Sequence, residues 1–405
     1  MINFADTAFI LICSAMVCFM TPGLAFFYGG LVRRKNALTI MMQSFICMGI
    51  VAVLWFFCGF SLAFGKDIGG VIGNLQFAFL NGVGMQASET YGTTIPFITF
   101  FIFQLMFAII APALITGAFA DRLKFRSYLV FVVLWSLIVY IPATHWVWGG
   151  GFLQKLGVAD FAGGIVIHAT AGFSALATVL FVGKRNMLPG EEAKPHNITY
   201  VALGTGLLWF GWFGFNGGSA LAANGTAAIA FANTAISGAV AMITWLVIST
   251  IHNKRPSIVE AMTGAVAGLA TITPAAGHVA PWAAAVFGLC AGIVCYLAVM
   301  LRKKAGWDDA LDVWGVHGIG GAFGSILLGV FAQKQFGGVS GFIDGNGRQL
   351  WVQLIAVVFV SAYSLVVTLG MLKVMNAVSP VRVSKEDELK GLDEALFKEE
   401  AYSGL

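Results

Sequence analysis

Long apolar runs recur from one end of the chain to the other, and they limit its possible folds more than any other feature. Each run has about 20 residues, the length that a helix needs to cross about 30 Å of hydrocarbon. The sequence therefore predicts an all-α polytopic membrane protein, with a loop rich in Gly and Asn over 65–95. Eleven transmembrane helices are predicted near 8–29, 38–64, 96–120, 126–147, 161–183, 198–217, 225–251, 258–276, 281–301, 311–332 and 350–377.

The composition agrees with a membrane protein, because 59% of the residues are hydrophobic and 10% are charged, with a mean hydropathy of +0.86. A soluble domain carries about a quarter charged residues on its water-facing surface. The net charge of +4 is small and scattered, and no basic run is interleaved with aromatic residues. Nucleic acid is therefore excluded as a partner, and most of the surface is expected to face lipid.

The six cysteines all lie within apolar runs and form no CxxC pair. They are Cys13, Cys18, Cys47, Cys58, Cys290 and Cys295. Cysteines in such surroundings behave as small apolar packing residues. We therefore expect no disulfides, no metal site and no cofactor.

The basic residues predict the orientation. With eleven crossings and an external N-terminus, 19 of the 23 Lys and Arg residues fall in inner loops or near the C-terminal end. The outer side receives only Lys66, Lys155, Lys334 and Arg348. Basic loops stay in the cytoplasm, so we expect a protein of the cytoplasmic membrane with its C-terminus inside. The first run lacks a basic n-region and a small-residue cleavage site before it, so it is expected to be a retained helix.

The character of the chain changes after residue 378. Residues 1–378 are expected to form the transmembrane domain, and 379–405 a charged cytoplasmic tail. Two roles are compatible with this tail: a merely solvated terminus and a regulatory docking element.

Two of the predicted helices share a spacing of polar residues. Asp160 precedes His168 by eight residues, Asp309 precedes His317 by eight residues, and small residues follow each histidine. The two helices start from opposite sides of the membrane. A rise of 1.5 Å per residue places each histidine about 12 Å below its aspartate, close to the midplane. The spacing therefore predicts two histidines at one depth.

Matched elements of opposite topology are typical of inverted-repeat transporters, whose central site lies between the repeats. The first five and the second five helices would form two inverted five-helix repeats, over about 1–185 and 198–335, and the eleventh helix would be an addition. The alternative is a coincidence, because Asp and Gly are common near helix ends.

A histidine pair in the membrane suits a conduction path. Intramembrane ionisable residues are costly and usually mark a pathway. A neutral imidazole both donates and accepts hydrogen bonds, and imidazole titrates near neutral pH, so it can pass a proton. If the rings touch, one nitrogen–nitrogen hydrogen bond would fix complementary tautomers. A metal site is disfavoured, because no carboxylate or thiolate ligand is expected at this depth.

Aromatic residues beside Gly-rich turns mark the outer side. Trp148 ends the fourth helix, Phe107 lies in the third, and Ser219 follows the sixth. The faces of Trp148 and Phe107 are suited to hold a small cation, with Ser219 accepting a hydrogen bond. Phenylalanines below this cage would form a dry constriction. For Trp146 and Phe213 an interfacial aromatic belt is the preferred interpretation.

Four strings closely resemble the ammonium transporter (Amt/MEP/Rh) family, and most of all its bacterial and archaeal Amt branch. They occur in order along nearly the whole chain: FFYGG from Phe26, DFAGG from Asp160, GWFGFN from Gly211 and DVWGVHG from Asp312. The resemblance implies ammonium or ammonia as the transported species. It also implies a homotrimer with one conduction path in each subunit.

By matching motifs, the resemblance implies roles for residues on the outer side. Trp148, Phe107 and Ser219 match the external recruitment site for ammonium, and Phe107 and Phe215 match a stacked phenylalanine gate. Asp160 matches an aspartate near the recruitment site that holds backbone geometry and favours a cation indirectly.

The same comparison of motifs implies the pore residues. His168 and His317 match the twin-histidine pair of the family, and Trp212 and Thr273 match positions beside the lumen. The segment from Arg382 to Tyr402 resembles the C-terminal region of the family, which implies docking of a PII signalling protein. Phe397 departs from the histidine that many members have there, which puts regulation through the tail in doubt.

The expected function is ammonium transport: external capture, loss of the proton, and passage of ammonia past the histidines. Deprotonation is favoured because a bare cation is costly in a narrow apolar pore. The sequence leaves open whether the proton follows or returns outside, and the resemblance favours charge movement. The alternatives are an ammonium sensor that signals through a tail-bound partner, a neutral gas channel, and a membrane enzyme. No nucleophile–base pair or cofactor loop supports an enzyme.

Overall fold

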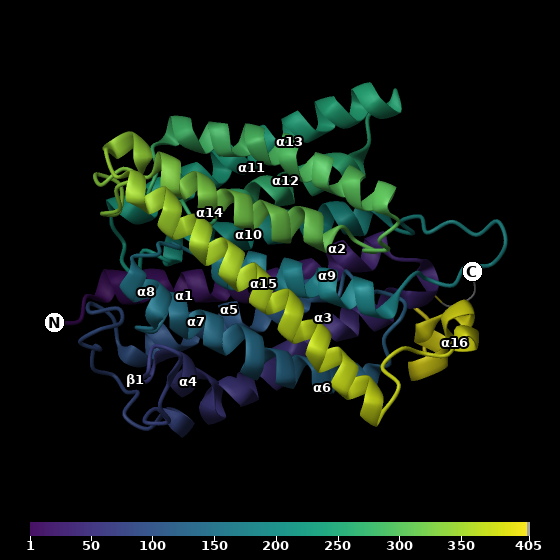
Figure 1. Ribbon diagram of the computed structural model, residues 1–405, viewed down its shortest axis with the longest axis horizontal. Helices are drawn as coiled ribbons and strands as arrows, with labels where there is room; N and C mark the ends of the chain where they lie inside the picture. The colour runs from purple at the N-terminus through teal and green to yellow at the C-terminus, as the bar shows by residue number, and fades with distance from the viewer. Residues whose placement is uncertain (403–405) are drawn as a thin grey trace.

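The helices of the protein lie side by side in one bundle. The computed structural model describes residues 1–402, so the last three residues of the predicted tail lie outside the described residues. The two ends of the chain lie at opposite ends of the bundle, and the long helix α15 crosses its front obliquely (Figure 1). The α-helices are α1 (Phe4–Cys18), α2 (Met20–Leu31), α3 (Ala37–Leu54), α4 (Phe60–Phe64), α5 (Phe97–Ile115), α6 (Phe125–Trp135), α7 (Ile141–Trp148), α8 (Phe152–Leu156), α9 (Thr170–Val182), α10 (Ile198–Gly218), α11 (Gly225–Asn253), α12 (Ile258–Ile272), α13 (Pro281–Ala305), α14 (Ile319–Phe331), α15 (Gly347–Val378) and α16 (Lys385–Lys390).

Shorter helical pieces join or extend these helices. Three are 3-10 turns: η1 (Arg34–Asn36), η3 (Ala78–Leu80) and η7 (Phe342–Asp344). Five are wider π-helical turns: η2 (Trp55–Gly59), η4 (Ser136–Tyr140), η5 (Gly164–Ala169), η6 (Trp314–Gly318) and η8 (Asp393–Phe397).

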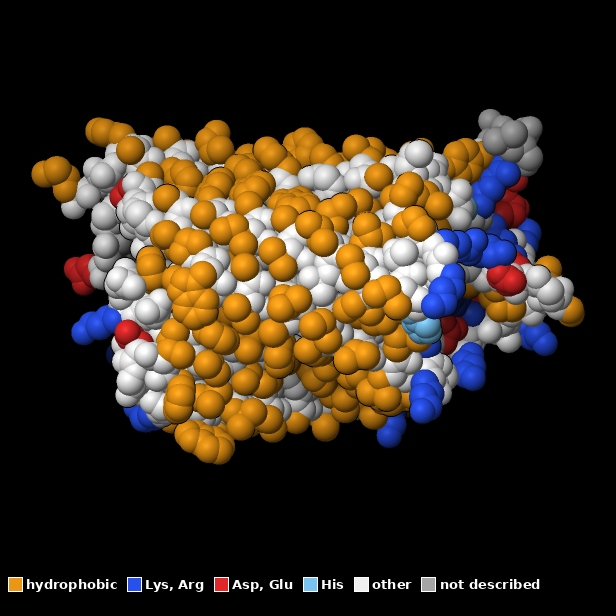
Figure 2. Space-filling model, turned by 90° about the horizontal axis from the view of Figure 1, so that it is seen from above, with side chains coloured by type: hydrophobic (Ala, Val, Ile, Leu, Met, Phe, Trp, Pro, Cys, Tyr) orange, Lys and Arg blue, Asp and Glu red, His pale blue; other side chains and the backbone are white. Residues whose placement is uncertain are grey.

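Ten continuous helical segments between residues 1 and 402 are long and apolar enough to cross a membrane. The run predicted at 258–276 forms α12, a shorter apolar helix that ends at Ile272. The chain turns just beyond it at Pro274, whose ring does not continue a helix. Figure 2 shows hydrophobic side chains covering the flank of the bundle. The chain is therefore an all-helical, multi-pass membrane protein with ten or eleven crossing helices.

The predicted loop at 65–95 contains a small hairpin that is fastened to α7. Strands β1 (Asp67–Ile68) and β2 (Ile72–Gly73) pair antiparallel. One nitrogen of the buried His145 ring lies 2.8 Å from the Ala63 carbonyl, and the other lies 3.0 Å from Asp67. Lys155 also donates to Asp67, at 2.6 Å. Hydrogen bonds from His145 and Lys155 lower the pKa of Asp67 to about 2, so this carboxylate stays charged and holds the hairpin.

The helices that carry the two histidines meet backbone to backbone. A Cβ added at Gly172 in α9 would lie 2.1 Å from the Cα and N atoms of Gly318 in η6. A Cβ at Gly321 in α14 would lie 2.5 Å from the Gly164 carbonyl oxygen. Only glycine permits so close an approach. These contacts bring the two histidine-bearing segments together at the centre of the bundle.

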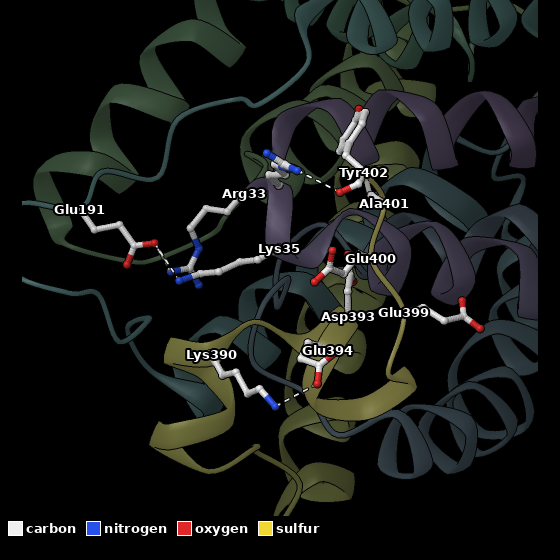
Figure 3. Close-up of a pocket in the computed structure, with 11 residues that line it drawn as sticks. Arg33, Lys35, Glu191, Lys390, Asp393, Glu394, Glu399, Glu400, Ala401 and Tyr402 are labelled. Carbon is white, nitrogen blue, oxygen red and sulfur yellow. Dashed lines mark hydrogen bonds and ion pairs between the residues drawn. The ribbon is translucent and has the colours of Figure 1, made fainter. Parts of the chain in front are cut away.

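The tail folds back on loops at its own end of the bundle instead of extending into solvent. The Glu388 carboxylate is fully buried and accepts from the backbone and side chain of Asn186, at 2.6 and 2.7 Å. Asp393 accepts from the backbone N–H of Thr39 at 2.7 Å. A cavity of about 430 Å³ remains between the tail and the loop that begins at Arg33 (Figure 3). The interpretation as a merely solvated terminus is therefore wrong for this segment.

The glycine contact predicts a difference between two otherwise similar substitutions. Gly172→Ala should destabilise the protein by about 1–3 kcal/mol, because a methyl group in a filled interior forces backbone shifts. Gly206→Ala on α10 should have little effect, because nothing lies within 4 Å of the added Cβ. Thermal unfolding in detergent checks both variants. Equal midpoints for the two would contradict the close approach of α9 and η6.

Candidate functional site

The first histidine-bearing segment begins at an aspartate that caps it. Asp160 accepts from four successive backbone N–H groups at 2.7–3.0 Å. A carboxylate at a helix N-terminus satisfies donors that otherwise have no partner and complements the positive end of the helix dipole. Asp160 is buried, and its two oxygens point into the start of η5. This aspartate therefore holds the backbone that leads to His168.

The second segment uses the same arrangement. Asp309 accepts from the N–H groups of Val313 and Trp314, at 3.1 and 2.8 Å. These bonds fix the start of η6, which carries His317. Both histidines therefore lie on π-helical turns, which are frequent at functional sites. The apolar runs at 161–183 and 311–332 predicted ordinary helices at both places.

The two histidines, which the spacing placed at one depth, lie in contact. The Nδ1 atoms of His168 and His317 lie 3.3 Å apart, and the ring centroids 5.2 Å apart. One Nδ1 donates and the other accepts, so the two rings take complementary tautomers. The Nε2 atom of His168 is buried and has no hydrogen-bond partner among residues 1–402. This nitrogen is left for a molecule that passes the pair.

A narrow cavity lies along the histidines. Its volume is about 10 Å³, which is room for about one water-sized molecule. Apart from the two imidazoles and an indole, its walls are apolar. They are made by Met20, Leu24, Phe27, Ile110, Leu114, Ile167, His168, Leu208, Trp212, Phe215, Val266 and His317.

Trp212 forms one wall of this cavity and is held from behind by Thr273. The Trp212 ring stacks on His168 with centroids 5.4 Å apart. Its indole N–H donates to the Thr273 hydroxyl at 2.8 Å, and that hydroxyl donates to the Leu269 carbonyl. The structure therefore places Trp212 on the cavity and Thr273 behind it, where Thr273 orients the indole.

Two stacked phenylalanines separate the narrow cavity from a second, wider cavity, the vestibule. The rings of Phe107 and Phe215 lie 4.3 Å apart with an angle of 29° between their planes. Both side chains are buried. Phe215 lines the narrow cavity and Phe107 lines a wider vestibule. The stack is therefore the partition between the two spaces.

The vestibule has a volume of about 280 Å³ and brings together the four residues predicted for cation recruitment. The Trp148 ring stands at 85° to Phe107, with centroids 6.2 Å apart. Its N–H donates to the Asp160 carbonyl at 2.8 Å. The Ser219 hydroxyl donates to the Phe215 carbonyl at 2.8 Å, which leaves its lone pairs free to accept. The vestibule therefore combines aromatic faces with a hydroxyl acceptor.

Among the further polar side chains that line the vestibule, two are buried, and sequence reasoning assigned them no role. They are Gln104 in α5 and His278 in the turn between α12 and α13. The signal available in the sequence was a lone polar residue within an apolar run, which is usually functional in a membrane protein. Within residues 1–402, no group of three or more His, Cys, Asp or Glu side chains is placed to hold a metal ion.

Comparisons with known proteins agree with the motifs. A profile of the Ammonium Transporter Family matches residues 8–402. The ammonium transporter of Bacillus subtilis is 44% identical over 400 residues, which cover 98% of each chain. The ammonium transporter Amt1 of Archaeoglobus fulgidus is 46% identical over 398 residues, covering 98% of this chain and 99% of the relative.

Solved structures lead to the same family. The crystal structure of Candida albicans Mep2 superposes with a TM-score of 0.89 at 34% identity, covering 95% of this chain and 88% of Mep2. Nearly the whole length of the chain is matched by the profile, by both relatives and by this structure. The chain belongs to the Ammonium Transporter Family.

Proposed function

We propose that this chain transports ammonium by binding the cation in the outer vestibule, removing its proton and passing ammonia along the twin histidines. The observation that carries the mechanism is the Phe107–Phe215 stack, 4.3 Å between centroids, which divides a vestibule with cation-binding groups from a dry cavity. Family membership supports ammonium as the substrate and transport as the activity. It also favours a transporter over an enzyme and over a sensor.

The two spaces differ in what they offer a cation. In the vestibule, the faces of Trp148 and Phe107 attract positive charge and Ser219 accepts a hydrogen bond. The inner cavity is lined mainly by hydrocarbon and has room for about one water-sized molecule. An ion without its hydration shell is very costly there. Ammonium can enter by giving up its proton, whereas potassium has no proton to give up.

The histidine pair supplies a route for the proton. His168 Nε2 has no partner among the described residues and faces the species that enters. A proton taken there would make His168 an imidazolium, which would release its Nδ1 proton to His317 across the 3.3 Å contact. The proton would then move in step with ammonia, and transport would carry charge. A neutral gas channel would instead return the proton to the outside.

The proposed architecture has eleven crossings in two inverted halves, about 1–185 and 198–335, followed by one further helix. The paired aspartate caps, at Asp160 and Asp309, and the contact between the two histidines support this repeat. The proposal includes an external N-terminus and a homotrimer in the cytoplasmic membrane. On the face shown in Figure 2, the Lys and Arg side chains gather toward the end that carries the C-terminus, which supports a cytoplasmic position for that end.

Residues 1–378 form the proposed transmembrane domain, and 379–405 a regulatory tail that receives a PII signalling protein. The contacts of the tail with several inner loops support regulation. Arg382 donates to the Val182 carbonyl at 2.6 Å, and Tyr402 lies 3.2 Å from His196. A partner that moves the tail would therefore disturb loops at the inner ends of several helices.

Replacing either histidine should remove the selectivity for ammonium. In His168→Ala or His317→Ala, water enters the enlarged cavity and the proton route is lost. We expect the ratio of ammonium to potassium permeation in proteoliposomes to fall by at least about tenfold, since desolvation of the ion sets the barrier. The measurement is the current evoked by an ammonium jump on a solid-supported membrane. Unchanged discrimination would contradict the role of the pair, and uptake without current would contradict charge movement.

The two oxygens of Asp160 predict a graded effect of substitution. Asp160→Ala removes the acceptors of four N–H groups and should cost about 2 kcal/mol of stability or more, together with transport. Asp160→Asn keeps one acceptor oxygen and should fall between Asp160→Ala and the native chain. Thermal unfolding and ammonium current in the same preparations check this order. An alanine variant as stable as the native chain would contradict the capping role.

A further inference from the structure

The vestibule contains more polar groups than the proposed cation cage uses. His278 and Gln104 both line it, together with Trp148, Asp160 and Ser219. Each of the two side chains is 9% exposed. Buried polar groups are nearly always hydrogen-bonded, so an unpartnered one needs an explanation. Both His278 Nδ1 and Gln104 Oε1 are buried without a hydrogen-bond partner within residues 1–402.

An ammonium ion in this space needs acceptors that the cage does not supply. The ion has four N–H donors, whereas Ser219 provides one free hydroxyl acceptor. The carboxylate of Asp160 is occupied, because each of its oxygens already accepts from two backbone N–H groups. Aromatic faces attract the charge but accept N–H groups only weakly. Further oxygen or nitrogen acceptors in the vestibule would replace water that the cation gives up.

His278 is held in a fixed orientation by its neighbours. Its ring lies edge-on to Phe161, with centroids 5.1 Å apart and an angle of 79°. Its Nδ1 atom is turned toward a tight backbone bend at Gly337, where an added Cβ would lie 2.5 Å from Nδ1. No hydrogen bond between the described residues involves the opposite nitrogen, Nε2. His278 lines the vestibule, so we take Nε2, the nitrogen away from the bend at Gly337, as the atom that can meet a molecule there.

The protonation state of His278 allows one of its ring nitrogens to accept a hydrogen bond. Burial lowers the pKa of its imidazole to about 4, although the backbone of Phe336 and Gly337 acts against that shift. The ring is therefore neutral at neutral pH and carries one proton. In the tautomer with this proton on Nδ1, Nε2 keeps its lone pair and can accept a hydrogen bond.

The amide of Gln104 is free to accept a hydrogen bond from the same cation as His278. No hydrogen bond between described residues fixes its amide, so turning the oxygen toward a cation costs no bond within the protein. It lies in α5 one helical turn before Phe107, on the same side as the cage. An amide oxygen and an imidazole nitrogen would then face the vestibule from two different elements.

We propose that His278 is a further ammonium-binding residue, whose Nε2 accepts an N–H of the cation in the vestibule, with the Gln104 amide oxygen as a second acceptor. This inference rests on the proposed function and adds two acceptors to the recruitment site. It also adds selectivity. An imidazole nitrogen suits an N–H donor, whereas hard metal cations prefer oxygen ligands. Recruitment would therefore favour ammonium over potassium before the cation reaches the phenylalanine stack.

The test compares His278→Phe with His278→Gln in proteoliposomes, by the ammonium concentration that gives half-maximal current. The phenylalanine variant keeps a ring against Phe161 and removes the acceptor. Because a hydrogen bond to a charged group is lost, its KM should rise about tenfold, and added potassium should inhibit more strongly. The glutamine variant restores an acceptor and should recover most of the affinity. Gln104→Leu should also raise KM. In all three variants the maximal current should change less than KM does.

The outcomes separate this inference from the proposed function. A native chain that takes up no ammonium would overturn transport itself. Native uptake with the same KM in His278→Phe and in Gln104→Leu would overturn only the added acceptors. A lower maximal current at unchanged KM would also overturn them, because it would place the effect after binding. Thermal unfolding controls for folding, and should His278→Phe fail to fold, Gln104→Leu tests the same pair of acceptors.

Discussion

The conduction path depends on carboxylates that cap helices inside the protein. Asp160 accepts hydrogen bonds from four backbone N–H groups, and Asp309 accepts them from two. Both lie at the starts of the segments that carry the histidines. A buried carboxylate is tolerated because these donors replace its hydration. The caps set where each segment begins, and therefore how deep His168 and His317 lie. Without these caps, nothing would fix the depth at which the two imidazole Nδ1 atoms meet, 3.3 Å apart.

The caps act together with glycines that remove side chains from the crossing point. Gly172 and Gly318 let the backbones of α9 and η6 approach to a distance that excludes even a methyl group. In lipid, such packing replaces the hydrophobic effect as the force between helices. Capping by a carboxylate recurs at the end of the bundle that carries the tail, where Asp393 accepts hydrogen bonds from the first N–H groups of α3. The tail is thus joined to the bundle by the device that positions the histidines.

Much of this arrangement followed from the sequence. The spacing from Asp160 to His168 and from Asp309 to His317, with opposite directions, predicted two histidines at one depth. That they are in contact is a finding of the structure. The length of the apolar runs located ten of the crossing segments. The spacing carries no signal for the π-helical turns, because one extra residue in a turn leaves an apolar run apolar. Glu388 is buried because it pairs with Asn186, about 200 residues away in the sequence. The many charged residues around Glu388 indicate an exposed segment and give no sign of this partner.

Two side chains, Thr273 and His278, have positions or contacts that the sequence did not indicate, and for the same reason. Thr273 was expected beside the lumen, but its hydroxyl holds the indole of Trp212 and does not reach the cavity. His278 lies in a short turn with no motif around it, and only the fold brings that turn to the vestibule. In both cases the direction of one side chain decides its role, and neighbours distant in sequence set that direction. Polar residues within apolar runs are therefore the positions where a structure adds most to the sequence of a membrane protein, because each one needs a partner or a substrate.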